Sequence, residues 1–313
     1  MTMIRANGLL DLELRHLAAL QAVAEEGTFG KAAVRLGYTQ SAVSQQIAAL
    51  ERIVGIKLVE RPGGPRKVFL TEAGRMLLRH GDAVMARLQA AQADLQALAD
   101  GAAGPLRIGT YQSVGAKVLP TVIRRFTAAW PQVDVELREA SQDTELLDAV
   151  ERGDLDLAFV MLPVEAGPFE TVELMRDPYV LVVPAGSPLA REAPTLRRIA
   201  EEPLIGFRDC RSTDFVEAHF RNRGAQPRFV FRSDDNPTVR GLVAAGVGIA
   251  LMPMLTVDDT DPAIEVVRLG DRVPPRLIGI AWHRDRYRSA AGEAFVELAG
   301  EVCAELAAQP AAA

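Results

Sequence analysis

Residues 28–51 carry the feature that most limits how this chain can fold, a fixed spacing of small and apolar residues. Gly37 follows Ala33 by four positions, and Val43 follows Gly37 by six. Two short helices that cross tightly need a small residue at their contact, here Ala33, and a turn residue that tolerates positive φ, here Gly37. Val43 is the first of the apolar residues that anchor the second helix. The spacing predicts a helix-turn-helix.

The second helix of this pair has a polar face opposite Val43. Its side chains are short hydrogen-bonding groups of the kind that enters the major groove of DNA: Gln40, Ser41, Ser44 and Gln45. Exposed polar residues are equally ordinary on a generic three-helix bundle, which therefore stays an alternative. A further helix is expected over residues 12–26, ending at Gly27, and Thr28 can cap the helix after it.

A small basic hairpin is expected directly after these helices. Strands at 57–61 and 67–71 flank residues 62–65, whose sequence Pro-Gly-Gly-Pro is typical of a turn. The segment 31–67 holds seven cations and two anions, whereas 75–313 holds 26 cations and 34 anions. The net charge of −6 therefore hides a basic region that precedes an acidic one. A basic region beside a helix-turn-helix favours DNA binding.

A long helix is expected over residues 71–99, which contain no proline. Apolar or small residues recur there at alternating spacings of four and three, the pattern of a coiled-coil seam. Gly81 and Ala91 weaken this seam, and an amphipathic helix packed on its own domain is the alternative. We expect a dimerising helix, because a long helix between domains needs a partner for its apolar side. The seam positions are Leu77, Gly81, Val84, Leu88, Ala91, Leu95 and Leu98.

Strands and helices alternate after a linker at residues 100–105, which indicates parallel α/β units. The pattern predicts strands at 106–111, 133–138, 155–160, 170–175, 178–184, 203–207, 228–232, 248–252 and 276–282. It predicts helices near 114–129, 143–152, 213–223, 237–245 and 289–306. These elements are enough for two α/β lobes.

The chain resembles the LysR-type transcriptional regulators along nearly its whole length. The resemblance is carried by residues 29–51 with their Thr-Gln-Ser-Ala-Val-Ser sequence, by residues 55–61, and by the Leu-Thr-Glu-Ala-Gly sequence at 70–74. Residues 153–158 and 242–253 are similar to the effector-domain signatures of that family.

The resemblance implies an α/β multidomain chain with three parts. These are a winged helix-turn-helix DNA-binding domain at residues 1–70, a dimerisation linker helix at 71–100, and a two-lobed effector domain at 101–313 similar to periplasmic binding proteins. It also implies a homodimer through the linker helix and a homotetramer made of two such dimers. The chain departs from the family pattern at Val59, in place of the usual phenylalanine, which we expect to be a packing variant. It departs again at Gln45, where many members have arginine, so a base or phosphate contact is expected to differ.

The resemblance further assigns DNA contacts residue by residue. Residues of the second helix are expected at base edges or nearby phosphates, and the cations at phosphates or in the minor groove. A solvated surface charge is the alternative for each cation. The target is expected to be double-stranded DNA with an interrupted inverted repeat. The expected DNA-binding residues are Lys31, Gln40, Ser41, Ala42, Ser44, Gln45, Arg61, Arg66 and Lys67.

Doubly wound sheets bind ligands beyond the carboxyl ends of their strands, where helix N-termini gather. The resemblance places the inducer cleft of the family along the same edges. An N-cap role is the alternative for Ser113, Ser141 and Thr213, and Arg208 is expected to pair either a ligand carboxylate or a neighbouring aspartate, at 209 or 214. The expected effector is an unidentified small molecule, with a small organic acid as a first guess. The expected effector-binding residues are Gln112, Ser113, Ser141, Gln142, Met161, Arg208, Thr213, Asp235 and Asn236.

Other function classes lack support in the sequence. The four histidines lie in different expected elements, with no His-x3-His or Cys-x2-Cys spacing and no nucleophile–base–acid set, so no catalysis, metal or cofactor is expected. Two cysteines exclude a disulfide framework, and a redox role of Cys210 stays open. No apolar run is long enough to span a membrane, and the N-terminus lacks signal-peptide features. We therefore expect a cytoplasmic protein.

These patterns together predict a sequence-specific DNA-binding transcriptional regulator, an activator or a repressor, controlled by a small effector bound between the lobes. RNA polymerase is a further expected partner. Two alternatives remain: a sensing module whose N-terminal part only dimerises, and an architectural protein that binds DNA without sequence preference. Salt-dependent and sequence-selective DNA binding separates the regulator from both.

Overall fold

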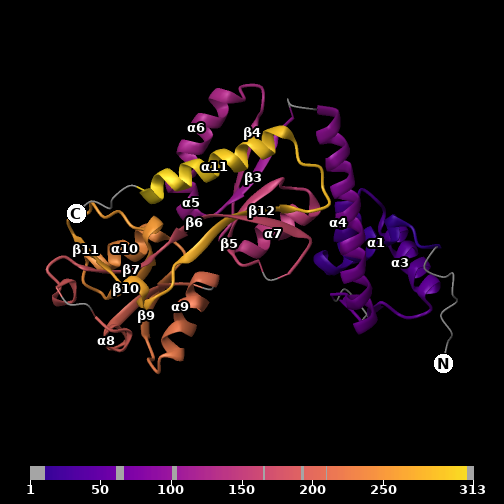
Figure 1. Cartoon of the computed structure of the whole chain (residues 1–313). Coiled ribbons are helices and arrows are strands. Elements are labelled where there is room, and N and C mark those ends of the chain that lie inside the picture. The colour runs from indigo at the N-terminus through magenta and orange to yellow at the C-terminus, as the bar shows by residue number, and fades with distance from the viewer. Residues whose placement is uncertain are drawn as a thin grey trace. The chain divides into compact units, whose positions relative to one another are not determined.

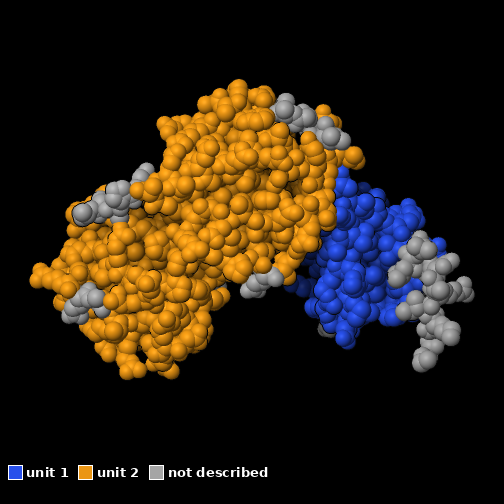
Figure 2. Space-filling view, viewed as in Figure 1, with its two compact units in different colours: residues 1–91 blue, residues 92–313 orange. Residues whose placement is uncertain are grey.

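The computed structural model describes residues 11–60, 67–100, 104–164, 166–191, 194–208 and 210–308, without the side chains of Ala93, Gln96, Ala97, Leu98 and Asp100. The chain forms two compact units, residues 1–91 and residues 92–313, named unit 1 and unit 2 below (Figures 1 and 2). None of the helices in the described part is both long and apolar enough to cross a membrane.

Unit 1 begins with three helices around one apolar core. They are α1 (Leu14–Glu26), α2 (Phe29–Leu36) and α3 (Gln40–Val54). Each ends at a glycine in the left-handed conformation, and Thr28 and Thr39 cap α2 and α3 by accepting from the backbone N–H three residues further on. Ala33 and Val43 both lie in the shared core. The predicted helix-turn-helix is confirmed.

A two-stranded hairpin and the start of a long helix complete unit 1. The antiparallel strands β1 (Val59–Glu60) and β2 (Phe69–Leu70) are shorter than the strands expected at 57–61 and 67–71. Helix α4 (Glu72–Asp100) follows, and the boundary between the two units falls inside it. The expected domain limits after residues 70 and 100 stay a prediction. Arg61 and Arg66 lie outside the described residues.

Gly74 allows the first turn of α4 to lie directly against the hairpin. Thr71 donates its hydroxyl to the carbonyl of Lys57 at 2.8 Å and accepts from the N–H of Gly74 at 3.0 Å. A Cβ on Gly74 would lie 2.1 Å from the carbonyl oxygen of Leu58. The Thr-Glu-Ala-Gly sequence at 71–74 therefore reflects a close approach of two backbone segments.

Unit 2 has two lobes, and lobe 1 consists of residues 104–177 and 276–308 (Figure 1). Its strands are β3 (Leu106–Thr110), β4 (Val135–Glu139), β5 (Leu157–Leu162), β6 (Phe169–Asp177) and β12 (Arg276–His283). Its helices are α5 (Gln112–Lys117), α6 (Leu119–Ala129), α7 (Asp143–Arg152) and α11 (Ala290–Ala308). The strand order is β4-β3-β5-β12-β6, with β3 parallel to both neighbours and β12 antiparallel to both of its own. Neighbouring β5 residues pack in different cores, Phe159 with α6 and α11, and Val160 with α7, so helices cover both faces.

Lobe 2 consists of residues 178–275 and repeats this layered arrangement. Its strands are β7 (Tyr179–Pro184), β8 (Pro203–Phe207), β9 (Arg228–Ser233), β10 (Ile249–Pro253) and β11 (Ile264–Arg268). Its helices are α8 (Leu196–Ala200), α9 (Arg211–Asn222) and α10 (Asn236–Ala244). The strand order is β11-β7-β10-β8-β9, with β8 parallel to β10 and β9. One core joins the sheet to α8 and α9 through Ile199 and Phe220, and the other joins it to α10 through Val239.

The chain passes between the lobes at two adjacent points. It leaves lobe 1 where β6 ends at Asp177, and it returns where β12 begins at Arg276. These two residues are direct partners in the β12–β6 ladder. The two connections between the lobes therefore lie side by side.

The expected alternation of strands and helices is confirmed, with three differences. The single helix expected near 114–129 is divided into α5 and α6, because Pro120 lies at the start of α6. Strand β11 was not expected. It is an edge strand of five residues, too short for an alternation of apolar and polar side chains to distinguish it from a loop. Helix α8 was also not expected, since its five residues are too few to show a helical period.

Substitution of Gly74 by alanine is expected to lower the free energy of unfolding of unit 1 by about 1–3 kcal/mol, because the new methyl group would overlap backbone. Amide hydrogen exchange of α1 to α3 in the full chain measures this loss. Gly30→Ala is the control, since its Cβ would meet Gln40 at an ordinary 3.8 Å, and alanine is the better helix former. Equal protection in both variants would show that the close approach at Gly74 has no energetic weight.

Candidate functional site

The first candidate site is the exposed face of α3 in unit 1. Val43, Ile47 and Leu50 are fully buried on the inner side of this helix. The predicted contact residues occupy the remaining positions of its first two turns. Gln40, Ser41 and Gln45 are exposed, and Ala42 and Ser44 are half-buried. Their exposure leaves this face open to a macromolecule, and their role in DNA contacts stays a prediction.

Two of the predicted cations are exposed and have no carboxylate partner in the described part of unit 1. These are Lys31, in the first turn of α2, and Lys67, which precedes β2 and packs its methylenes near Gly27. Other cations of this unit are already paired, Arg35 with Glu25 and Lys57 with a buried carboxylate described below. Lys31 and Lys67 are therefore available to bind an external anion.

Glu51 connects the C-terminal part of α3 to the hairpin. Its side chain is 6% exposed, and one carboxylate oxygen accepts from the backbone N–H groups of Leu58 at 2.9 Å and Val59 at 3.3 Å. The other oxygen pairs with Lys57 at 2.9 Å. Burial alone would raise the pKa of Glu51, but the hydrogen bonds from Lys57 and the two amides outweigh it and hold that pKa below its usual value. The carboxylate thus fixes the hairpin relative to α3.

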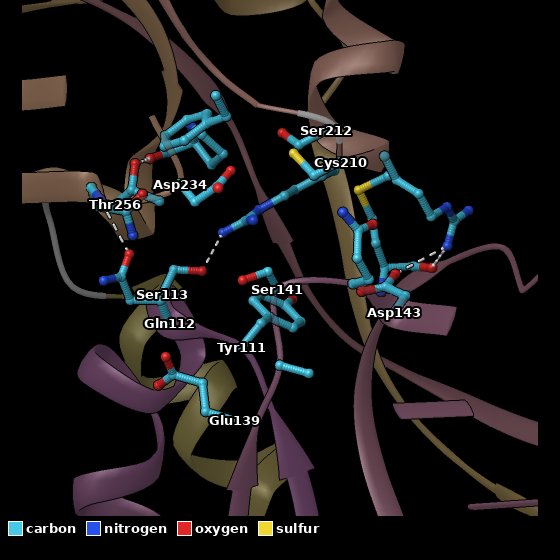
Figure 3. A pocket seen from close by; sticks show the side chains of 18 residues that line it. Tyr111, Gln112, Ser113, Glu139, Ser141, Asp143, Cys210, Ser212, Asp234 and Thr256 are labelled. Carbon is cyan, nitrogen blue, oxygen red and sulfur yellow. Dashed lines mark hydrogen bonds and ion pairs between the residues drawn. The ribbon is translucent and has the colours of Figure 1, made fainter. Parts of the chain in front are cut away.

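The second candidate site is a cavity of about 150 Å³ between the two lobes of unit 2. Figure 3 shows residues of lobe 1 on one side, among them Tyr111, Ser113 and Ser141, and residues of lobe 2 on the other, among them Ser212 and Asp234. Six of the predicted effector-binding residues line it: Gln112, Ser113, Ser141, Gln142, Met161 and Asn236. The cavity lies where the carboxyl ends of the parallel strands face the other lobe, as the rule for doubly wound sheets predicts.

Three predicted residues do not line this cavity, for identifiable reasons. Arg208 is exposed and pairs at 3.4 Å with Asp234, which is not one of the two aspartates named as its alternative partner, and residue 209 lies outside the described residues. Thr213 turns inward and donates its hydroxyl to the carbonyl of Phe207 at 3.3 Å. Asp235 caps α10 by accepting from the backbone N–H of Thr238 at 2.9 Å. Their expected place in the cavity wall is corrected.

Ser113, Ser141 and Thr213 are not helix N-cap residues in this structure. Ser141 precedes Gln142, which is the N-cap residue of α7, and Thr213 follows the N-cap residue of α9 by three positions. Ser113 lies inside α5, is 3% exposed, and accepts from Arg276 at 2.8 Å. Of these three hydroxyls, Ser113 therefore has a defined partner in the cavity wall.

A buried ion pair adjoins the cavity, because Arg276 lines it and pairs with Asp177. Arg276 donates from Nε to Asp177 at 2.8 Å and from Nη2 to the same carboxylate at 2.7 Å. Its side chain is 8% exposed and that of Asp177 is 1% exposed. The guanidinium also lies 5.5 Å from the ring of Tyr111. Burial raises the pKa of Asp177, against the opposing effect of Arg276 and of the N–H groups that donate to it.

Two further polar contacts join the lobes at the cavity. Arg211, the first residue of α9 in lobe 2, pairs at 3.2 Å with Asp143 of lobe 1 and donates to the carbonyls of Met161 and Pro163. Gln112 of lobe 1 donates to Asp235 at 3.3 Å and accepts from the N–H of Asn236 at 3.2 Å. Each contact involves a residue in the first turn or at the N-cap of a helix.

Sequence reasoning missed Arg276 and Arg211, although both line the cavity. The rule that ligands bind beyond strand carboxyl ends selects residues that follow a strand. Arg276 instead begins β12, and because β12 is antiparallel to β5, its first residue lies at the same edge as the end of β5. The only sequence signal was an arginine directly before the apolar run of 277–282.

The two cysteines occupy different environments. Cys210 lines the cavity and lies 3.4 Å from the hydroxyl of Thr213. Cys303 is fully buried in lobe 1, and burial raises the pKa of its thiol to about 11, which keeps the thiol protonated at neutral pH.

Two family models match the chain, and both have counterparts in the two units. Residues 14–75 match the model described as bacterial regulatory helix-turn-helix protein, lysR family. Residues 99–304 match the model described as LysR substrate binding domain.

Individual proteins are similar to the chain over nearly its full length. The uncharacterized HTH-type transcriptional regulator YybE of Bacillus subtilis is 31% identical over 288 residues, which cover 91% of this chain and 97% of that protein. The probable hydrogen peroxide-inducible genes activator of Mycobacterium leprae is 31% identical, with 91% of this chain and 93% of that protein covered. Among solved structures, an OxyR mutant of Corynebacterium glutamicum aligns with a TM-score of 0.59 at 28% identity, covering 95% of this chain and 94% of that one.

Glu51→Ala is expected to reduce the local stability of α3 by about 1–3 kcal/mol at pH 7, because two buried N–H groups lose their acceptor. Glu51→Gln keeps an acceptor for these groups and removes only the charge. A carboxyl whose pKa is lowered by folding stabilises the fold above its unfolded pKa, and this contribution is lost as the pH falls. The difference between wild type and Glu51→Gln should therefore shrink as the pH falls below about 4.5, the ordinary value.

Hydrogen exchange of the α3 amides between pH 3 and 7, corrected for the intrinsic exchange rate, provides the measurement. A difference between wild type and Glu51→Gln that is the same at every pH would contradict the assigned charge interaction.

Proposed function

Since the chain belongs to the LysR family of transcriptional regulators, we propose that unit 1 reads a specific DNA sequence and that an effector in the cavity of unit 2 controls the outcome. The observation that carries this proposal is that unit 1 has an open polar face on α3 and two exposed cations without an ion pair among its described residues, and that unit 2 has a polar cavity between two lobes. Members of this family are transcriptional regulators, and we propose no catalytic activity for this chain.

The proposed DNA interface divides the work between two kinds of residue. Ser41, Ala42, Ser44 and their neighbours Gln40 and Gln45 meet base edges or nearby phosphates in the major groove. Lys31 and Lys67 neutralise phosphates on either side of the helix-turn-helix, together with Arg61 and Arg66 of the hairpin turn. Gln45 provides an amide where many relatives have a guanidinium, so it contacts a different base or lacks a phosphate contact that the arginine makes.

The proposed assembly is a homodimer through α4 that pairs further into a tetramer. Val84, Leu88 and Leu95 lie on the expected seam of this helix and are 47%, 45% and 69% exposed. Three large apolar side chains in line on one helix are stabilised by burial against an equivalent helix, at about 1.5–3 kcal/mol each when fully covered. A dimer with two-fold symmetry then presents two copies of α3, which accounts for an interrupted inverted repeat as the target.

The proposed control acts through the angle between the lobes. An effector that contacts both walls of the cavity favours one lobe arrangement, and it shifts the population by its difference in affinity for the two arrangements. In a tetramer such a shift changes the spacing of the DNA-binding pairs, and with it DNA bending and access of RNA polymerase. A protein that acts in this way on the chromosome works in the cytoplasm.

Binding of the full-length protein to DNA from directly upstream of its own gene, with random DNA as competitor and salt varied, tests the proposal. We expect selective binding whose affinity falls steeply with salt. Ser44→Ala should weaken operator binding about 5- to 150-fold, equivalent to about 1–3 kcal/mol, and leave random DNA unaffected. Lys31→Ala should weaken both DNAs alike and reduce the salt slope by about one.

Lys117→Ala, which removes an exposed cation of unit 2, is the matched control and should leave both DNAs unaffected. Equal affinity of the wild type for upstream and random DNA at every salt concentration would show that the upstream DNA is not its target. If genome-wide selection also finds no preferred sequence, the protein is an architectural DNA-binding protein and the proposal is wrong.

Leu88→Glu is expected to shift the protein toward the monomer, because a charge in the seam of α4 cannot be buried without a partner. Gln89→Glu adds the same charge to the next, exposed position and should leave the assembly intact. Sedimentation velocity over a range of protein concentrations measures the distribution. An unchanged oligomer for Leu88→Glu would place the dimer interface elsewhere.

A further inference from the structure

The arginine side chains in the walls of the cavity are already bound to other groups of the protein. Arg276 is the more deeply buried of the two arginines that line it, with a side chain 8% exposed. Two of its three nitrogens bind Asp177 and Ser113. Among the described residues Nη1 has no hydrogen-bond partner, and it is not among the fully enclosed unpaired atoms either. Because Arg276 lines the cavity, Nη1 is the nitrogen of this side chain that is left to donate to a ligand.

The positive charges at the cavity are compensated by the protein itself. Arg276 is neutralised by Asp177, and Arg211 by Asp143 at 3.2 Å. Asp234, which also lines the cavity, pairs with Arg208 outside it at 3.4 Å. Glu139 is the remaining charged residue of the lining, and it has no ion pair in the described part of the chain. The three pairs cancel, and Glu139 leaves the wall with a net charge of −1.

A carboxylate ligand would gain little in such a cavity. Transfer of an anion from water carries a desolvation cost, which binding sites for anions offset with an uncompensated cation. Here the guanidinium that offers Nη1 already has its counterion at 2.7 Å, and Glu139 adds repulsion. An uncharged oxygen has a much smaller desolvation cost, and a single hydrogen bond from a charged donor is enough to offset it.

The remaining polar groups are also suited to an uncharged ligand. Tyr111 also lines the cavity, but its hydroxyl is fully enclosed by protein and has no hydrogen-bond partner among the described residues, so it is not open to a ligand. Burial raises the pKa of Tyr111, so this residue adds no negative charge to the wall at physiological pH. Ser141 and the side-chain amide of Asn236 also line the cavity, and both can donate and accept. These groups match amide, carbonyl and hydroxyl groups of a ligand.

We infer that the effector of this regulator is a small uncharged polar molecule, with an amide, carbonyl or hydroxyl oxygen that accepts from Nη1 of Arg276. This inference rests on the proposed function of the cavity as the effector site and narrows its ligand class. It differs from the first guess made from the sequence, a small organic acid, and the arginine considered there as a carboxylate partner, Arg208, does not line the cavity. Because Arg276 begins β12 at the connection between the lobes, the ligand contacts the connecting segment directly.

Matched pairs of small probes that differ in charge test the inference on the wild-type full-length protein. Acetamide and acetate, succinamide and succinate, and benzamide and benzoate are compared at millimolar concentration by calorimetry and by thermal shift. We expect at least one amide to bind at least tenfold more tightly than its carboxylate. A carboxylate that binds more tightly than its amide, or no binding by any amide, would overturn the inference.

Arg276→Lys identifies the donor, because lysine keeps the charge next to Asp177 but has no second nitrogen to aim into the cavity. It should reduce amide affinity at least tenfold. Arg125→Lys, at an exposed ion pair with Glu305 whose residues do not line the cavity, is the matched control and should leave amide affinity unchanged. Amide binding that survives in Arg276→Lys would contradict the assigned donor, and the comparison on wild type stands even where this variant does not fold.

Upstream DNA binding measured on the same wild-type sample keeps the two proposals distinguishable. Selective DNA binding together with preferred binding of carboxylates overturns the ligand class alone. Loss of DNA selectivity together with amide binding overturns the proposed function and leaves the ligand class standing.

Discussion

The arrangement of unit 2 depends on one buried ion pair, between Asp177 and Arg276. These residues are where the chain leaves lobe 1 and where it returns, and they are partners in one strand ladder. Burying two charges costs several kcal/mol per ion, which good geometry and additional hydrogen bonds must offset. Ser113 of lobe 1 accepts from the guanidinium, and the N–H of Leu255 in lobe 2 donates to the carboxylate at 3.1 Å. The pair therefore joins both lobes, and both chain connections, next to the cavity.

Strand β12 connects this ion pair to the linker helix. Arg276 begins the strand, and Arg286 follows its last residue by three positions. The side chain of Arg286 is 7% exposed, pairs with Asp94 of α4 at 2.9 Å, and donates to the carbonyl of Leu155 at 3.4 Å. β12 lies between β5 and β6 in the sheet of lobe 1. One strand therefore begins at the cavity arginine and ends three residues before an arginine that binds the part of α4 belonging to unit 2.

The sequence predicted those features that depend on neighbouring residues, and it missed those that depend on topology. The spacing of Ala33, Gly37 and Val43 predicted the helix-turn-helix, since helix contacts and glycine turns have local signatures. Six of the nine predicted effector-binding residues, chosen by the rule on strand ends, line the cavity. Arg276 could not follow from that rule, because only the antiparallel pairing of β12 with β5 brings the beginning of one strand to the end of the other. Arg208 does follow a strand, as the rule requires, but its side chain pairs with Asp234 and does not line the cavity. The rule on strand ends does not predict the direction of a side chain.

The two sites treat charge in opposite ways, and this difference accords with two different ligands. On unit 1, Lys31 and Lys67 are exposed and unpaired in the described part of the chain. When these lysines bind a polyanion, counterions are released from it. This release favours binding and makes both the rate and the affinity of binding depend on the salt concentration. In unit 2 each arginine of the cavity wall has its own carboxylate. A cavity with compensated charges discriminates by hydrogen-bond direction, because a ligand that fails to satisfy Nη1 leaves a buried donor unpaired. The proposed DNA interface therefore uses uncompensated cations, whereas the proposed effector site uses cations whose charge is already compensated.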